Sequence, residues 1–280
     1  MAKRKSVKEI IDSKKDGRKL TMLTAYDAAM AAMLDDCGVD MLLVGDSLGM
    51  VMLGYDSTVP VTMDEMLHHS GAVRRGAPTA FVVGDMPFGS YQSSPRDGIV
   101  NGTRFLKEAG CDAVKLEGGL EVCDTVGGMV RAGIPVMGHI GLTPQTASQL
   151  GGYKVQGRDR ASAEKMLAEA RGLVDAGVFG IVLECVPDGL AKVISEAVAV
   201  PTIGIGAGIH CDGQVLVTHD LLGMFEKFIP SFVKTYTRLA PLMKENISTY
   251  CEEVKNGVFP DDAHSFVSEQ DFSKLLSGEQ

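Results

Sequence analysis

Six side chains that can act as acids, bases or metal ligands lie at or just after the ends of short apolar runs. An amphipathic segment follows each run, as expected for alternating strands and helices. If the runs are parallel strands, their C-terminal ends meet at one mouth, where α/β barrels carry their active sites. The pattern therefore predicts an enzyme. The six are Asp46 after LLVG, Asp85 after FVVG, Lys115 and Glu117 in DAVKLE, His139 after PVMG, and Glu184 after GIVL.

Asp46, Asp85 and Glu117 follow three predicted strands in succession. Carboxylates held close together repel one another, which raises their pKa values, and a divalent cation relieves the repulsion. Ligands that are all oxygen favour Mg²⁺, Mn²⁺ or Ca²⁺ over zinc. Each carboxylate taken alone also fits as the cap of the helix that follows it. Three in series favour a metal site.

Lys115 and Glu117 are two residues apart, so they share one face of their strand. A lysine at a barrel mouth can pair with the carboxylate of a substrate, form a Schiff base with a carbonyl, or make a structural salt bridge. A Schiff base would repeat what a metal does for a carbonyl. Beside a carboxylate cluster, charge pairing with a substrate is the favoured role.

His139 and Glu184 are candidates for contact with the reacting atoms. His139, in GHIGLTPQ, can donate a hydrogen bond to a substrate oxygen, although a lone histidine is often structural. Glu184 lies among apolar residues in IVLECVP, which would raise its pKa and suit a general base, or it could support a neighbouring strand. Strand alternation would turn the adjacent Cys185 away from Glu184. A metal, a base and an anion-binding lysine together indicate enolate chemistry on an α-keto acid.

The elements that must position these residues form eight strand–helix units. Eight units with short connections favour a closed (β/α)8 barrel over an open doubly wound sheet. A short helix at Val7–Ser13 would close the N-terminal end of the barrel, and Ser47–Thr62 is expected to be a long loop. We expect one domain over residues 1–280, with a capping helix in 1–18 and a polar arm in 252–280. The predicted strands are Leu20–Ala25, Asp40–Val44, Thr79–Val83, Asp112–Leu116, Pro135–Gly138, Gly180–Leu183, Pro201–Ile205 and Val215–Thr218.

Two further strand-end features have no secure chemical role. The glycines from Gly204 to Gly208 follow the seventh strand. They could receive an anion at backbone N–H groups, leave room for a ligand, or make a tight turn. Asp220 follows the eighth strand, and it shares with the six residues above only its position at the end of a strand.

Composition argues against several classes of function. A net charge of −9 argues against a nucleic-acid-binding surface. No apolar run approaches the roughly 20 residues that span a membrane, and the basic N-terminus lacks the apolar core of a signal peptide. Six cysteines without a CxxC pair are typical of free thiols in a reducing compartment, so we expect a cytoplasmic protein.

Several long segments together resemble the ketopantoate hydroxymethyltransferase (3-methyl-2-oxobutanoate hydroxymethyltransferase) family. The resemblance covers nearly the whole chain, from about Val7 to Pro260. Its motifs are LTAYD (Leu23–Asp27), LLVGDSLGMVMLGYDSTVPVTMDEM (Leu42–Met66), VVGDMPFGSYQ (Val82–Gln92), AVKLEGG (Ala113–Gly119), GHIGLTPQ (Gly138–Gln145), LECVP (Leu183–Pro187) and TIGIGAG (Thr202–Gly208).

The resemblance implies a (β/α)8 barrel of the phosphoenolpyruvate/pyruvate-binding type. It implies transfer of a hydroxymethyl group from 5,10-methylenetetrahydrofolate to α-ketoisovalerate, giving ketopantoate for pantothenate and coenzyme A synthesis. It also implies Mg²⁺ in each subunit and a homodecamer built as a pentamer of dimers. By motif match, Asp46 and Asp85 would hold the metal, with Glu117 joining directly or through water. Asp46, Ser47, Asp85, Lys115 and His139 would contact the keto acid, and Glu184 would accept the proton; no residue is assigned to the folate.

Three other interpretations stay open. Metal-dependent lyases and phosphomutases of the same barrel superfamily usually present a reactive cysteine in a KKCGH-like loop, which this sequence lacks. A class I aldolase would use Lys115 to form a Schiff base. A barrel kept only as a binding scaffold would not need an intact set of polar strand ends.

Overall fold

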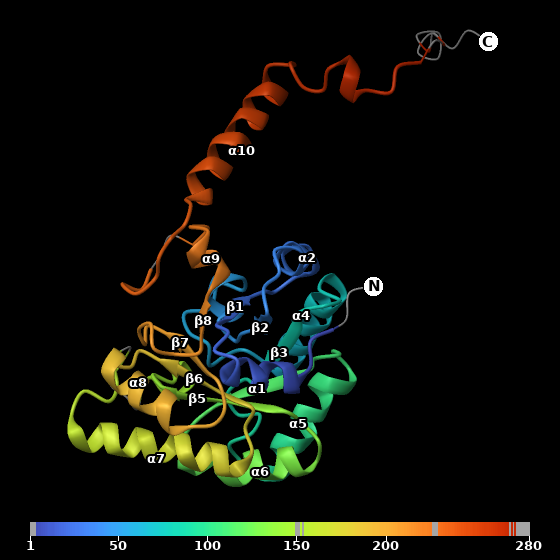
Figure 1. Ribbon diagram of the computed structural model, residues 1–280. Helices are drawn as coiled ribbons and strands as arrows, with labels where there is room; N and C mark the ends of the chain where they lie inside the picture. Colours follow the sequence, from blue (N-terminus) through green and yellow to red (C-terminus); the bar gives the residue numbers. More distant parts are fainter. Residues whose placement is uncertain are drawn as a thin grey trace.

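The strands form a closed barrel in a computed structural model that describes residues 4–148, 152, 154–225, 229–268, 270 and 272 (Figure 1). All eight strands are parallel and pair in chain order, and β8 returns to pair with β1. The predicted (β/α)8 fold is therefore confirmed. The strands are β1 Leu20–Thr24, β2 Met41–Val44, β3 Phe81–Asp85, β4 Ala113–Glu117, β5 Val136–Gly141, β6 Gly180–Glu184, β7 Thr202–Ile205 and β8 Gly213–Leu216.

The helices begin where local sequence signals place them. Thr62 and Glu65 form the expected capping box at the start of α4, and Ser94 caps α5, whose first residue is Pro95. The prediction of a loop throughout Ser47–Thr62 is wrong, because a turn of largely apolar residues forms the short helix α3 directly after β2. The α-helices are α1 Val7–Lys15, α2 Ala28–Asp36, α3 Leu48–Val51, α4 Met63–Gly76, α5 Pro95–Lys107, α6 Cys123–Arg131, α7 Arg160–Ala176, α8 Asp188–Ala197, α9 Thr218–Leu221 and α10 Leu239–Lys255. The 3₁₀ helices are η1 Leu120–Val122, η2 Pro144–Thr146 and η3 Asp262–His264.

Helix α1 closes the N-terminal end of the barrel, as expected. Ile10 is fully buried in the same apolar cluster as the inward-facing strand residues Met22, Met41 and Ile203. Lys14 at the other end of the helix forms an ion pair of 2.8 Å with Asp212, which directly precedes β8. A second, larger cluster fills the layer between the strands and the outer helices. With both strand faces buried in apolar layers, polar side chains are concentrated at the strand ends.

Carboxylates at the N-terminal ends of the strands fasten neighbouring strands together. Asp40 precedes β2 and accepts the backbone N–H of Thr21 in β1 at 3.0 Å. Asp112 precedes β4 and accepts the N–H of Val82 in β3 at 2.8 Å. Asp212 precedes β8 and accepts the N–H of Thr202 in β7 at 2.8 Å. Aspartates thus stabilise this end of the barrel, which leaves the C-terminal end for chemistry.

After α9 the chain leaves the barrel, and α10 projects away from it (Figure 1). One face of this helix carries Met243, Ile247, Tyr250 and Val254, whose side chains are 45–59% exposed. Their spacing of three to four residues places them on a single stripe of an α-helix. We call these four residues the α10 stripe. Glu252, the expected start of the polar arm, lies in the last turns of the same helix.

Candidate active site

The C-terminal ends of the strands surround a cavity of about 570 Å³. This volume lies in the range of roughly 300–1,000 Å³ that holds drug-sized ligands. It exceeds what a five-carbon keto acid fills, so a second ligand has room. The lining includes all the predicted site residues, namely Asp46, Ser47, Asp85, Lys115, Glu117, His139 and Glu184.

Lys115 lies at the centre of the buried charges. Its Nζ atom is 2.8 Å from Oδ1 of Asp85 and 3.9 Å from Oε1 of Glu117. The first contact follows from strand register, because Asp85 and Lys115 are partners across β3 and β4. Burial opposes the charge of Lys115, but the carboxylates of Asp85, Glu117 and Asp46 outweigh it and hold its pKa above the ordinary value. Lys115 is therefore a stable cation, which suits anion binding better than Schiff-base formation by a neutral amine.

Asp46 and Asp85 lie side by side after β2 and at the end of β3. The backbone N–H of Asp46 donates to Oδ2 of Asp85 at 3.1 Å. Burial, together with the charge of Asp85, raises the pKa of Asp46 to about 7. Two adjacent buried carboxylates beside one lysine leave negative charge that further positive charge would stabilise.

Glu117 is held in place from two sides. The backbone N–H of Gln145 donates to its Oε2 atom at 3.1 Å. The hydroxyl oxygen of Tyr91 accepts from the N–H of Glu117 at 3.1 Å and lies 3.0 Å from the Glu117 carbonyl oxygen. Burial raises the pKa of Glu117 well above its ordinary value, and the opposing charge of Lys115 does not offset it.

The carboxylate side of the site fits a hard divalent cation. Asp46, Asp85 and Glu117 are all buried and offer only oxygen ligands, the type that Mg²⁺ prefers. Burial is the main cause of the raised pKa values of Asp46 and Glu117, and the charges of the neighbouring carboxylates raise both values further. Among the residues that the structure describes, no group of three or more His, Cys, Asp or Glu side chains lies in an arrangement that could hold a metal ion by itself. A cation at this site would therefore also need ligands from water or substrate.

His139 connects the lysine to the glutamate. Its Nδ1 atom is 3.1 Å from Nζ of Lys115, and its Nε2 atom is 3.2 Å from Oε2 of Glu184. Burial and then the charge of Lys115 lower the pKa of His139 well below its ordinary value, so the ring is neutral. A neutral ring that accepts from Lys115 at Nδ1 carries its proton on Nε2, the ring atom that lies beside Glu184. Burial raises the pKa of Glu184 to about 7, which suits a general base.

Two local geometries differ from the predictions. β5 continues to Gly141, so His139 lies inside the strand and not after it. The prediction that strand alternation turns Cys185 away is wrong, because β6 ends at Glu184 and Cys185 has a φ of 48°. Cys185 therefore lines the cavity. Burial raises the pKa of its thiol to about 11, so the thiol stays protonated near neutral pH and is a poor nucleophile.

Gln145 organises the site, and no role was predicted for it. Its side-chain amide donates to Oδ2 of Asp46 and to the carbonyl of Met86, both at 2.9 Å. Its side-chain carbonyl accepts from the Tyr91 hydroxyl at 2.8 Å. The motif GHIGLTPQ contains Gln145, but a motif does not show which strand a loop residue reaches. Gln145 thereby ties the loop after β5 to the ends of β2, β3 and β4.

The glycines after β7 make room for a packed side chain. Gly206 has a φ of 61°, and a Cβ atom added there would lie 2.8 Å from the ring of Phe232. Phe232 lines the cavity. Of the roles left open for these glycines, this geometry favours the tight turn, which lets an aromatic residue from the segment after α9 approach the mouth.

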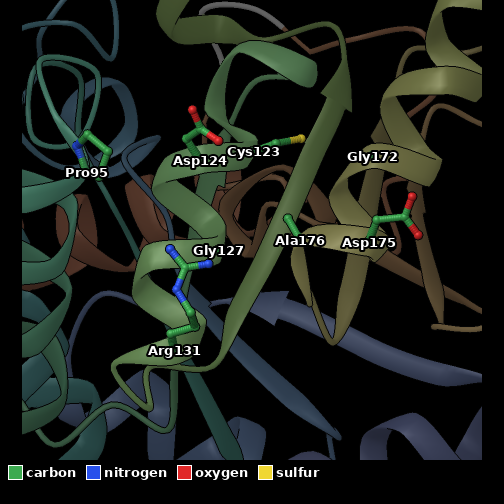
Figure 2. Close-up of a pocket in the computed structure, with 8 residues that line it drawn as sticks. All are labelled: Pro95, Cys123, Asp124, Gly127, Arg131, Gly172, Asp175 and Ala176. Atoms are coloured by element: carbon green, nitrogen blue, oxygen red, sulfur yellow. The ribbon is translucent and has the colours of Figure 1, made fainter.

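A second, open pocket lies outside the barrel between α6 and α7 (Figure 2). Asp124, Gly127 and Arg131 come from α6, and Gly172, Asp175 and Ala176 come from α7. None of the predicted site residues lines this pocket. The chemistry expected from the sequence therefore belongs to the barrel mouth.

The family follows from comparison with known proteins. Residues 4–262 match the family model described as ketopantoate hydroxymethyltransferase. The chain belongs to this family. A relative from Desulfotalea psychrophila named 3-methyl-2-oxobutanoate hydroxymethyltransferase is 63% identical over 276 residues, which cover 99% of each chain. A relative of the same name from Carboxydothermus hydrogenoformans is 57% identical over 263 residues, covering 94% of this chain and 95% of its own.

Solved structures with little sequence similarity share the fold. A phosphonopyruvate hydrolase in complex with oxalate and Mg²⁺ aligns with a TM-score of 0.61 at 11% identity, covering 99% of this chain and 95% of its own. A 2,3-dimethylmalate lyase of the PEP mutase/isocitrate lyase superfamily aligns with a TM-score of 0.57 at 14% identity, covering 97% and 93%. These alignments show that the chain shares the barrel fold of those proteins.

Two further predictions concern membranes and thiols. Across the described part of the chain, every helix is too short or too polar to span a lipid bilayer. All six cysteines lie in that part, and each is a free thiol.

Proposed function

We propose that this chain transfers a hydroxymethyl group from 5,10-methylenetetrahydrofolate to α-ketoisovalerate, giving ketopantoate for pantothenate synthesis. Membership of the family supports the class of reaction. The observation that carries the proposal is the row Lys115, His139 and Glu184. It places a carboxylate with a pKa of about 7 beside a neutral imidazole and a buried cation.

Each residue of the row has a step to perform. Lys115 pairs with the carboxylate of the keto acid. Asp46, Ser47, Asp85 and His139 would make the other contacts with this substrate. Glu184 removes the proton from C3 of the keto acid, as a carboxylate with a raised pKa can. The electron pair left behind forms the bond from C3 to the methylene carbon. One of the two folate C–N bonds to that carbon breaks as this bond forms. Water then displaces the second folate nitrogen and becomes the hydroxyl group of the product. The two released nitrogens take up the proton from C3, passed on by Glu184, and the proton lost by water.

Asp46 and Asp85 would hold Mg²⁺, with Glu117 joining them directly or through water. When bound, a divalent cation acts as a Lewis acid toward a carbonyl oxygen and stabilises the negative charge that develops there. The charge imbalance among the three buried carboxylates supports this assignment. Removal of divalent metal with EDTA should abolish activity, and added Mg²⁺ should restore it.

A lyase or phosphomutase of the same superfamily is the alternative. The solved structures with such names are 11–15% identical to this chain and therefore support the fold alone. The sequence lacks the KKCGH-like cysteine loop. An aldolase that uses Lys115 as a Schiff base is also disfavoured, because the surrounding carboxylates hold this lysine in its charged form.

A product assay tests the proposed function. The purified chain with Mg²⁺, α-ketoisovalerate and 5,10-methylenetetrahydrofolate should form one ketopantoate for each methylene group consumed. Omission of the folate should leave no ketopantoate. Formation without folate, or cleavage of a malate- or phosphonate-type substrate in its place, would refute the proposal.

The chain is further proposed to act in the cytoplasm as a homo-oligomer, in the form of a decamer. Free thiols at all six cysteines support a reducing compartment. The α10 stripe supports self-association, because four large exposed side chains on one helix face form a patch that soluble proteins usually cover.

A further inference from the structure

Asp220 is a buried carboxylate that none of the steps above uses. It is 7% exposed, and it lines the cavity at the barrel mouth. Its Oδ1 atom has no hydrogen-bond partner among the residues that the structure describes. Burial raises the pKa of Asp220 to about 6, and no nearby positive charge offsets that effect. Because buried polar atoms nearly always have a partner, this oxygen is a candidate for contact with a ligand.

The fold places Asp220 across the mouth from Lys115 and Glu117. It belongs to α9, directly after β8, and β8 lies opposite β4 in the closed strand order. β4 carries Lys115 and Glu117. Thr218 anchors α9 to β1, since its N–H donates to Oγ1 of Thr24 at 3.0 Å and its own hydroxyl donates to the Thr24 carbonyl. Asp220 is thus held firmly at the side of the mouth where a second ligand would lie.

The cavity wall supplied by the chain after α9 is suited to a flat ring. This segment contributes Phe225, Phe232 and Val233 to the lining, and Val217 adds apolar surface next to Asp220 in the chain. Aromatic and branched apolar side chains pack well against planar ring systems. A ligand here would be a flat heterocycle with a polar edge toward the carboxylate.

We propose that Asp220 binds the edge of the folate pterin ring that carries N3–H and the 2-amino group. This inference rests on the proposed function, in which a reduced folate supplies the one-carbon unit. Two N–H donors side by side match the two oxygens of a carboxylate, as in bidentate carboxylate pairs with arginine. The cavity of about 570 Å³ has space for the pterin beside the keto acid.

A binding cycle with a modified ligand tests this contact. Dissociation constants are measured by calorimetry for tetrahydrofolate and for its 2-desamino-2-methyl analogue, with Mg²⁺ and α-ketoisovalerate present. The wild-type chain should bind the analogue about 10- to 100-fold more weakly, as expected for loss of a buried charge-assisted hydrogen bond. Asp220→Asn should bind tetrahydrofolate weakly and distinguish the two ligands far less.

The controls separate this contact from a general loss of binding. Asp188→Asn is matched to Asp220→Asn, because Asp188 follows β6 at the same end of the barrel but is exposed and does not line the cavity. It should leave both dissociation constants unchanged. A wild-type chain that binds the two ligands equally, or an Asp220→Asn variant that keeps the full discrimination, would overturn the inference. If the wild-type chain forms ketopantoate in either of those cases, the proposed function survives and only the contact is refuted.

Discussion

The three residues of the proposed proton-transfer row depend on one another for their charge states. Lys115 stays charged because it faces carboxylates, and its charge together with burial keeps His139 neutral. The Nε2 atom of the neutral His139 ring lies 3.2 Å from Oε2 of Glu184. Burial in turn raises the pKa of Glu184 to about 7, so that the carboxylate is a stronger base than an exposed glutamate.

This charge arrangement predicts how the rate of C3 proton removal depends on pH. Glu184 is protonated below its pKa and accepts a proton only when ionised, so the rate should rise with pH through about 7 and level off above it. Hydrogen–deuterium exchange at C3 of α-ketoisovalerate, followed by NMR with saturating Mg²⁺, measures that rate. Glu196→Gln should keep the same profile, since Glu196 is exposed on α8 and pairs with Lys192. A rate that does not vary between about pH 6 and 8 would contradict the assignment of Glu184.

At the scale of the elements, the ends of the strands have separate tasks. Carboxylates before β2, β4 and β8 fasten the barrel at its N-terminal end. The polar residues at the C-terminal ends meet in the cavity because the strands are parallel and in register, as with Glu117 and His139 across β4 and β5. The position of the proposed base depends in addition on how closely β5 and β6 approach each other.

Gly141→Ala should disturb that approach. Gly141 has a φ of 98°, and an added Cβ atom would collide with the carbonyl of Glu184. We expect a loss of about 1–3 kcal/mol in the free energy of unfolding, together with slower C3 exchange, because the Glu184 carboxylate is displaced. Urea unfolding and the exchange rate check the two effects. Gly189→Ala is the control, since open space surrounds Gly189 on α8, and it should be neutral or slightly stabilising. An equal effect of the two substitutions would count against this role of Gly141.

The sequence was sufficient to predict the strand order and the residues that meet at the mouth, because both follow from alternation and strand ends. It was not sufficient for features that depend on tertiary contact. Gln145 reaches three strands from a loop, and Cys185 turns into the cavity through a left-handed backbone conformation. Asp220 could be placed after the last strand, but only the structure shows that its carboxylate is buried without a partner.

At the scale of the whole molecule, α10 is a largely exposed helix. It projects from the barrel (Figure 1), and local periodicity could not have predicted its direction. The α10 stripe exposes 45–59% of each of its four side chains. Burial of such a surface against another copy would contribute roughly 25 cal/mol for each Å² of apolar area removed from water. This gain supports assembly of the chain through α10.

Ile247→Asp should therefore lower the oligomeric state. A charge in the middle of the α10 stripe is costly to bury, so the proposed decamer should dissociate into smaller species, as measured by sedimentation velocity. Ser248→Asp introduces the same charge at an exposed position away from the stripe and should leave the assembly intact. An unchanged sedimentation coefficient for Ile247→Asp would show that α10 does not form the interface.

The most direct test of the proposed chemistry is proton exchange at C3 of α-ketoisovalerate in D₂O without folate. The wild-type chain with Mg²⁺ should exchange this proton, and EDTA should stop the exchange. Glu184→Gln should slow it by about 10²- to 10⁴-fold, the usual contribution of a general base. Absence of metal-dependent exchange in the wild-type chain, or exchange at the full rate in Glu184→Gln, would contradict the proposed mechanism.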